Sequence, residues 1–155
     1  MTAADPVGVP EEVKRASINS YAAARTALDE VLLALPAEAP CGGWTVVEIA
    51  AHVAAWERRA ATLIPSLAEG AAAPGVDVDA FNTAAAAAAR SVPASETLAA
   101  YAESRANLLA ALTGAPAASF GEAAMLQQVE MERGHCLEHA AELRALVVGP
   151  GEAVP

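Results

Sequence analysis

The chain has 155 residues, with nineteen acidic and nine basic side chains and a formal net charge of −10 at pH 7. Nucleic acid binds to clustered Lys and Arg side chains, whereas the basic residues here are scattered along an acidic chain, so we expect no nucleic-acid partner. No segment offers about 20 uninterrupted apolar residues, and the N-terminus lacks the basic and apolar regions of a signal peptide. We therefore expect a cytoplasmic protein without a membrane partner.

The length is that of a single domain, residues 1–155. Residues 1–9 and 149–155 are expected to be disordered tails. Alanine, which has the highest intrinsic helix propensity, dominates the rest of the chain, and no alternating strand pattern is found. The chain is therefore expected to be helical throughout.

The first expected helix covers residues 10–35. Pro10 occupies a first-turn position that tolerates proline, apolar residues then recur at helical spacing, and Pro36 ends the helix. Residues 36–43 are rich in proline and glycine and are expected to form a loop.

The second expected helix has a well-marked start. Thr45 and Glu48 form a capping box, and the apolar residues on either side of it, Trp44 and Ile49, are placed as a hydrophobic staple. His52 follows on the inward apolar stripe of this helix. Pro65 is expected to distort the last turns because it lacks a backbone donor, and residues 70–78 to form a loop.

Three more helices are expected in the second half of the chain. They cover residues 79–90, capped by Asp79, residues 95–113, capped by Ser95, and residues 121–148. The pattern predicts an all-α fold, a four-helix bundle with one additional short helix.

Two of the three histidines of the chain, His135 and His139, lie four residues apart in the last expected helix. This spacing places them on one face, one turn apart. If the fold brings the third, His52, close to them, three imidazoles can bind one Zn, Ni, Fe or Cu ion and leave a position open, as in catalytic sites. The alternative is that the pair forms a solvated or hydrogen-bonded helix face.

The histidine pair belongs to a polar stripe beside an apolar one. The polar stripe consists of Gln128, Glu132, His135, His139 and Glu142, and the apolar stripe of Leu126, Val129, Cys136, Ala140, Leu143 and Val147. Glu132 is the candidate catalytic residue: it, or Glu142, could move a proton or orient an imidazole, the alternative being a plain surface carboxylate.

Other side chains near the pair have simpler interpretations. Cys136 is expected to be a small buried residue rather than a ligand, and both it and Cys41 to be free thiols. Tyr101 and Arg105 are a turn-spaced pair that could line a pocket, although Tyr101 fits the core better. The string His135-x-x-Glu138-His139 matches an inverted zinc-protease motif. A protease of that type needs a further acidic ligand well downstream, so we expect Glu138 to lie on the surface or behind the ligands.

Two segments resemble the signatures of the DinB superfamily. Residues 44–57, WTVVEIAAHVAAWE, are similar to its tryptophan-led motif, and residues 135–144, HCLEHAAELR, to its C-terminal HxxxHxxxLR element. Residues 78–82 and 98–112 are also similar to what lies between these motifs in the group. The resemblance thus covers almost the whole chain.

The resemblance implies a four-helix bundle in which His52, His135 and His139 bind a divalent metal, most commonly zinc or nickel. It also implies that Trp44 and Trp56 are structural or line a pocket. Characterised relatives include S-transferases and isomerases that use mycothiol or bacillithiol, and a resistance type that opens a strained cyclopropane by hydrolysis. Nothing in the chain matches the extra C-terminal domain of the maleylpyruvate isomerases.

We therefore expect a metal-dependent enzyme that acts on an electrophilic small molecule by hydrolysis or by transfer of a low-molecular-weight thiol such as mycothiol. Its role would be detoxification, self-resistance or specialised metabolism. The alternatives are a non-catalytic protein that sequesters a small molecule, and a purely structural bundle. The expected ligand is hydrophobic or bulky, and a homodimer is possible because dimers are common among relatives.

Overall fold

The structure, a computed structural model, describes residues 8–148. Within this range the chain forms five α-helices, one 3₁₀ helix and a two-stranded antiparallel sheet. These elements are, in chain order, α1 (Gly8–Leu32), β1 (Pro40–Cys41), β2 (Trp44–Thr45), α2 (Val46–Ala68), α3 (Val78–Ala89), α4 (Ala94–Gly114), η1 (Ala117–Gly121) and α5 (Ala123–Val147). The predicted all-α bundle with one extra short helix is confirmed.

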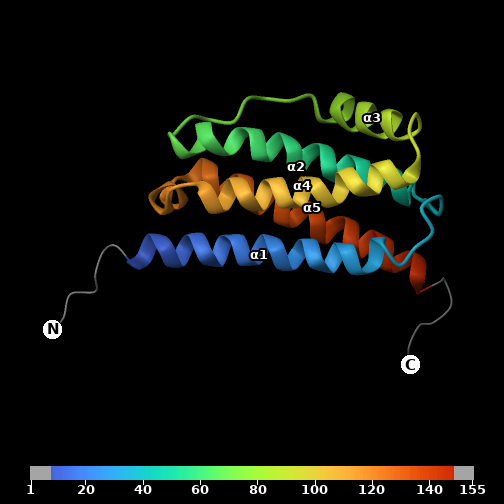
Figure 1. Cartoon of the computed structure of the whole chain (residues 1–155), viewed down its shortest axis with the longest axis horizontal. Coiled ribbons are helices and arrows are strands. Elements are labelled where there is room, and N and C mark those ends of the chain that lie inside the picture. The colour runs from blue at the N-terminus through green and yellow to red at the C-terminus, as the bar shows by residue number, and fades with distance from the viewer. Residues whose placement is uncertain (1–7, 149–155) are drawn as a thin grey trace.

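Four of the described helices run side by side and the fifth, α3, lies outside them on α2 (Figure 1). The colours in Figure 1 show that α1 and α5 run in one direction and that α2 and α4 run in the other. The most extensive contacts are between α1 and α5 and between α2 and α4, and α2 also packs against α5. The start of α2 and the second half of α5 therefore lie at the same end of the bundle.

The core contains apolar side chains from the four long described helices. They include Tyr21, Leu28, Ile49, Val53, Leu108, Leu112, Cys136 and Leu143. Burial of each large apolar side chain contributes roughly 1.5–3 kcal/mol to folding.

None of the described helices is both long enough and apolar enough to cross a membrane.

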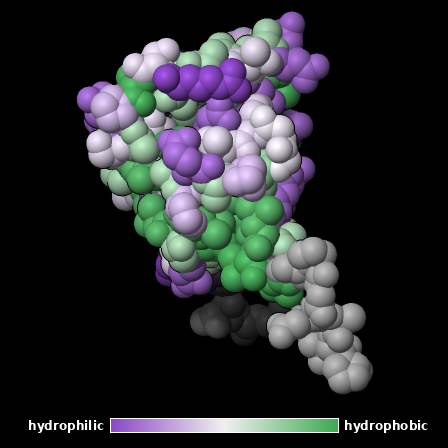
Figure 2. Space-filling model, turned by 90° about the vertical axis from the view of Figure 1, so that its right-hand side faces the viewer, coloured by the Kyte–Doolittle hydropathy of each residue, from purple (hydrophilic) through white to green (hydrophobic). Residues whose placement is uncertain are grey.

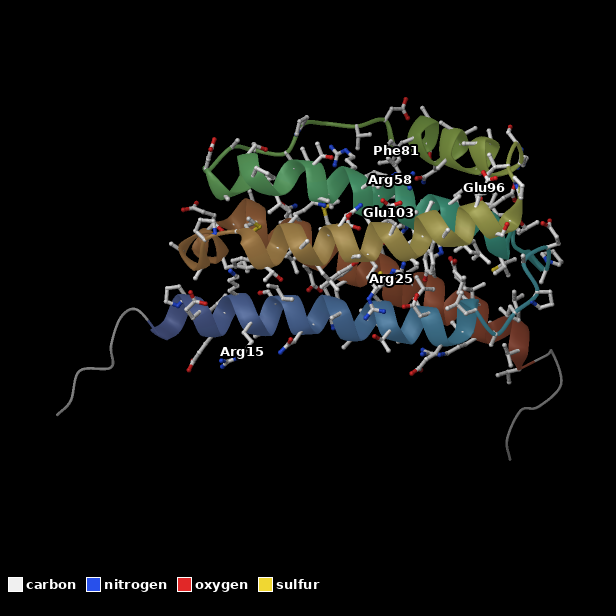
Figure 3. All side chains as sticks on the ribbon, viewed as in Figure 1. Arg15, Arg25, Arg58, Phe81, Glu96 and Glu103 are labelled. Atoms are coloured by element: carbon white, nitrogen blue, oxygen red, sulfur yellow. The ribbon has the colours of Figure 1, made fainter. Side chains whose placement is uncertain are left out.

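A buried polar cluster crosses this core. The Glu57 carboxylate accepts hydrogen bonds from the Tyr21 hydroxyl at 2.6 Å, from Arg25 Nε at 2.7 Å and from the Ser104 hydroxyl at 2.5 Å. The Arg25 guanidinium also donates to the Tyr101 carbonyl oxygen and lies over the Tyr101 ring. Figure 3 shows Arg25 pointing from α1 toward the other helices. The cluster ties α1, α2 and α4 together.

The predicted start of α2 is confirmed. Thr45 is the N-cap: its side chain accepts from Glu48 N, and the Glu48 side chain accepts from Thr45 N at 2.7 Å. Pro65 lies inside the last turns, and the helix continues to Ala68. The reciprocal cap is local, which is why four residues sufficed to predict it.

The predicted caps of α3 and α4 are wrong. Asp77, not Asp79, caps α3, with its carboxylate accepting from Ala80 N at 3.0 Å, and Asp79 lies in the first turn. The N-cap of α4 is Pro93, which makes no side-chain cap, and Ser95 lies inside the helix. In each case the predicted residue lies two positions after the observed N-cap, and composition alone does not choose between neighbours.

The first helix and the following loop also differ from the prediction. Helix α1 begins at Gly8, before Pro10, and ends at Leu32, four residues ahead of Pro36. The expected loop contains strands β1 and β2, in which Pro40 pairs with Thr45 and Cys41 pairs with Trp44. A two-glycine turn with Gly42 at a φ of 61° joins them. Strands of two residues are too short to produce an alternating pattern.

The leader and tail predictions fall largely outside the described residues. Gly8 belongs to α1, whereas residues 1–7 and 149–155 are not described. Exposed apolar side chains occur where α1 and α5 end, at Leu33, Leu146, Val147 and Val148. Figure 2, which looks at that end of the bundle, shows apolar surface there.

Candidate metal centre

The fold brings the three histidines together. His52 comes from the second turn of α2, and His135 and His139 come from successive turns of α5. The Nε2 atoms of His135 and His52 are 2.6 Å apart, and those of His139 and His135 are 3.0 Å apart. One ring nitrogen from each histidine lies within 4.8 Å of the others. Residues 83 positions apart in the chain thus form one cluster of imidazoles.

Burial keeps two of these imidazoles neutral. Desolvation, followed by the neighbouring His139, lowers the pKa of His52 to about 4. Desolvation, followed by His139 and His52, lowers the pKa of His135 to about 3. A neutral imidazole has a lone pair on one ring nitrogen, which is the form that binds a metal ion.

Glu142 orients the third imidazole. Its carboxylate accepts a hydrogen bond from His139 Nδ1 at 2.7 Å. Because Nδ1 then bears the proton, Nε2 bears the lone pair, and Nε2 faces the other two histidines. A carboxylate behind a histidine in this way is the usual arrangement behind metal ligands.

The donor set fits a divalent transition metal. His52 Nδ1 is buried and has no hydrogen-bond partner among the described residues, whereas Nε2 of the same ring faces His135 Nε2. Three imidazoles suit Zn, Ni, Fe or Cu. Zinc binds such nitrogens at about 2.0–2.1 Å. The cluster is compatible with metal binding, and the identity of the metal stays a prediction.

A pocket of about 470 Å³ opens onto the histidines. Its walls come from β2, α2, α3 and α5 and are mainly apolar, with Trp44, Trp56, Val78 and Met131 among the lining residues. Both tryptophans of the chain are therefore pocket residues. A pocket of this size holds a small molecule rather than a polymer.

Helix α3 positions one wall of the pocket. The Trp56 indole Nε1 donates to Asn82 Oδ1 at 2.8 Å, and the Trp56 ring lies 4.5 Å from the Phe81 ring. Figure 3 shows Phe81 reaching from α3 toward α2. The short helix thus holds the tryptophan in place and supplies Asn82 to the pocket lining.

Glu132 is buried in the pocket wall one turn before His135. Its side chain is 3% exposed, Oε1 accepts from the Gln128 amide at 2.9 Å, and Oε2 has no partner among the residues described. Burial, followed by the nearby Glu57 charge, raises the pKa of Glu132 to about 8. The carboxyl group can therefore hold or release a proton near neutral pH.

Of the other side chains singled out from the sequence, only Glu138 lines the described pocket. Tyr101 is buried in the core and Arg105 binds Asp29 at 2.5 Å, so this pair does not line it. Cys136 is fully buried and, like Cys41, is a free cysteine, as expected. Glu138 is exposed on the pocket rim.

The two stripes of α5 are not separated as predicted. Gln128, Glu132 and His139 are buried, while the ends of the apolar stripe, Leu126 and Val147, are exposed by 37% and 62%. Packing of α5 against both α1 and α2 buries two faces of its middle turns. Sequence reasoning missed the roles of Phe81 and Asn82, although both lie in the segment that resembles the DinB pattern.

Comparison with known proteins identifies the family. Residues 14–145 match the model of the mycothiol maleylpyruvate isomerase N-terminal domain. No curated protein and no solved structure gives a significant match. The match covers most of the chain and agrees with the helical bundle and the histidine cluster. The chain belongs to the mycothiol maleylpyruvate isomerase N-terminal domain family, a family of the DinB-like superfamily.

Proposed function

We propose that the protein is a metal-dependent enzyme that joins a low-molecular-weight thiol, such as mycothiol, to an electrophilic small molecule. The observation that carries the proposal is the convergence of three imidazole nitrogens at an apolar pocket. The family description, which names mycothiol, supports a thiol rather than water as the nucleophile. Hydrolysis at the same site is the second candidate.

His52, His135 and His139 would hold the ion. When bound, a divalent ion lowers the pKa of a coordinated thiol or water, so that the nucleophile is available at neutral pH. Glu142 keeps the His139 proton on Nδ1 and so directs its lone pair into the cluster. Trp44 and Trp56 exclude water from the pocket and provide flat apolar surfaces for the electrophile.

Glu132 is the proposed acid and base. In the ionised form its unpartnered Oε2 can accept the proton that the nucleophile loses, and in the protonated form the group can return a proton to the product. Its raised pKa matches this task near pH 7. None of the described pocket-lining residues is a lysine or arginine, so we name the electrophile by its chemical class and not as the maleylpyruvate of the family name.

Metal content tests the first part of the proposal. Elemental analysis of protein purified without an affinity-tag column is expected to find about one divalent ion per chain. His52→Ala and His139→Ala should each lose the ion. Glu142→Gln should retain a site but bind roughly 10–100-fold more weakly in a chelator competition, because only the support of His139 is removed.

Glu96→Gln is the matched control for Glu142→Gln, since Glu96 is exposed on α4 (Figure 3). It should leave metal affinity unchanged.

Absence of bound metal after incubation with zinc, nickel, iron and manganese would overturn the metal-dependent function. Mycothiol-dependent consumption of 1-chloro-2,4-dinitrobenzene that disappears in His135→Ala would support thiol transfer, whereas binding without turnover would favour a sequestering protein.

A further inference from the structure

Asn82, on α3, brings a side-chain amide to the pocket over the histidines. The side chain is partly buried and lines the pocket, and its Oδ1 accepts a hydrogen bond from the Trp56 indole Nε1 at 2.8 Å. An indole nitrogen only donates hydrogen bonds, so the amide atom that faces it is the oxygen. This contact determines how the amide is turned and leaves Nδ2 on its other branch.

The effect of Asn82 on His52 agrees with this orientation. Desolvation and the neighbouring His139 lower the pKa of His52, whereas Asn82 acts in the opposite direction and raises it. An oxygen near an imidazole favours the charged form, and an N–H group disfavours it. The amide oxygen therefore faces α2. No acceptor for Asn82 Nδ2 is found within residues 8–148, so its N–H groups are available to a ligand.

The helix that carries this amide is firmly attached to α2. The Phe81 ring lies 4.5 Å from the Trp56 ring, and Arg90, at the end of α3, pairs with Glu48. The position of α3 is thus set by contacts in its first turns and at its C-terminal end. A donor that is already in place needs little reorganisation when it binds an acceptor.

The amide adds to the groups of the proposed function and does not replace them. There, the ion on the three histidines activates the thiol, and Glu132, on α5, exchanges protons. Asn82 belongs to α3, which forms a different wall of the pocket, and its side chain is uncharged. A neutral N–H donor suits an uncharged oxygen, since neither group has to lose the hydration of a charge.

We propose that Asn82 Nδ2 donates a hydrogen bond to an uncharged oxygen of the electrophile, such as an epoxide or ketone oxygen, and that the site favours electrophiles of this class. The inference rests on the proposed function for the reaction, whereas binding of the oxygen does not depend on it. A hydrogen bond strengthens when negative charge develops on its acceptor. Asn82 therefore contributes to binding and contributes more to the reaction.

The opening of an epoxide illustrates the step. The thiolate sulfur forms a bond to a ring carbon, the bond between that carbon and the oxygen breaks, and the electron pair goes to the oxygen. Asn82 stabilises the charge there, and the oxygen takes up the proton that the thiol released to Glu132. The product is a hydroxy thioether, and no further reactant is consumed.

Binding of two fluorinated probes tests the donor without turnover. 4-Fluoroacetophenone and 1-ethyl-4-fluorobenzene have similar shapes, but only the ketone has an acceptor oxygen. Their dissociation constants are measured by fluorine NMR in chelator-treated protein, so that the ketone cannot bind an ion. Asn82→Asp keeps an acceptor for Trp56 Nε1 and removes the donor, whereas Asn82→Ala removes both.

The dissociation constant of the ketone, divided by that of the hydrocarbon, should rise at least about threefold in both Asn82 variants. This is the cost of losing one hydrogen bond between neutral groups. Asn107→Asp is the matched control, because Asn107 is exposed on α4 and does not line the pocket. It should leave the ratio unchanged.

Turnover provides a second measurement, in metal-loaded protein with mycothiol. Attack on styrene oxide moves the electron pair to an oxygen, whereas attack on benzyl bromide moves it to the departing bromide. Asn82→Asp should lower kcat/KM for styrene oxide at least about tenfold more than kcat/KM for benzyl bromide, because only the first reaction develops charge on an oxygen beside the donor.

An unchanged binding ratio in Asn82→Asp would overturn the proposal, as would an equal change in Asn107→Asp or the absence of saturable binding by both probes. A change confined to Asn82→Ala would also overturn it, since Asn82 would then only support Trp56. Equal losses of kcat/KM for both substrates would refute the selection and leave thiol transfer intact. Failure of the proposed function has a different signature: the binding ratio would still shift in a protein that binds no metal and turns over neither substrate.

Discussion

At the scale of single residues, burial decides which protonation states the site uses. His52 and His135 are held neutral because desolvation disfavours their charged forms. Desolvation disfavours ionisation of Glu132 as well, and the nearby Glu57 adds to this, while Gln128 and Arg59 act in the opposite direction. Two neutral imidazoles and a protonated carboxyl group therefore lie close together near pH 7.

Glu132 is expected to make folding stability depend on pH. Its pKa is about 8 in the folded chain, against an ordinary value of 4.5. Between these values the unfolded chain releases the proton and the folded chain keeps it, so the contribution to stability is full below pH 4.5 and is lost as pH rises toward 8. The side chain introduced by Glu132→Gln cannot ionise, so this variant should lose less stability than the original chain across this pH range.

Urea unfolding of chelator-treated protein at pH 5, 6.5 and 8 measures this difference. Between pH 5 and 8, Glu132→Gln should lose less stability than the original chain. The difference should be several kcal/mol at most, because one pKa unit corresponds to about 1.4 kcal/mol. Glu103→Gln, an exposed substitution of the same type, should follow the original chain. Parallel curves for the original chain and Glu132→Gln would show that Glu132 ionises normally.

At the scale of elements, the start of α2 links local capping to the site. The capping box at Thr45 and Glu48 determines where the helix begins, and His52 follows one and a half turns later on its inward face. Glu48 also binds Arg90 at the end of α3, so one side chain joins the cap of α2 to the helix that supports Trp56. The local signal for one helix start thus contributes to the position of the pocket wall.

Thr45→Ala should destabilise the protein by about 1 kcal/mol, since it removes the side-chain acceptor for Glu48 N. The free energy of unfolding in urea is the measurement. Thr62→Ala provides the control within the same helix, because the Thr62 hydroxyl is exposed and bonds only to the preceding turn at Arg58. An equal loss in both variants would mean that the cap contributes no more than an ordinary surface hydroxyl.

At the scale of the whole molecule, the buried Glu57 cluster sets the relative positions of the helices. Its carboxylate accepts from two side chains of α1 and one of α4, although it belongs to α2. Burial and the Glu57 charge raise the pKa of Tyr21, which keeps its hydroxyl protonated as a donor. A sliding movement of one helix past another would break these charge-assisted hydrogen bonds.

Glu57→Ala is expected to cost up to about 3–5 kcal/mol, because it removes the fully buried carboxylate that pairs with Arg25 and leaves the guanidinium only the partly exposed Asp29 as an ionic partner. The double variant Arg25→Met, Glu57→Leu should recover a large part of this loss, since no uncompensated charge remains. Both are measured by urea unfolding as a double-mutant cycle. Glu130→Ala removes a surface ion pair and should cost less than about 1 kcal/mol. A similarly small loss in Glu57→Ala would refute the role of the cluster.

The helices were predictable wherever the signal was local. Propensity, apolar spacing and the Thr45 cap identified the helices and the start of α2, while the wrong caps at Asp79 and Ser95 each fell within two residues of the observed N-cap. The two-residue strands were missed because pairing across a turn, and not composition, defines them. The Asn82 contact with Trp56 could not be predicted, since it joins residues 26 positions apart.

The amino-acid sequence by itself determined the helical content, the acidic character and the placement of His135 and His139 on one face of a helix, because these depend on residues within a few positions of one another. Only the tertiary structure decided that His52 meets them, that Glu132 is buried beside Glu57, and that the described pocket lining contains glutamates but no lysine or arginine. Those features depend on which helices pack together and at what offset, and that is set by contacts across the core between distant segments.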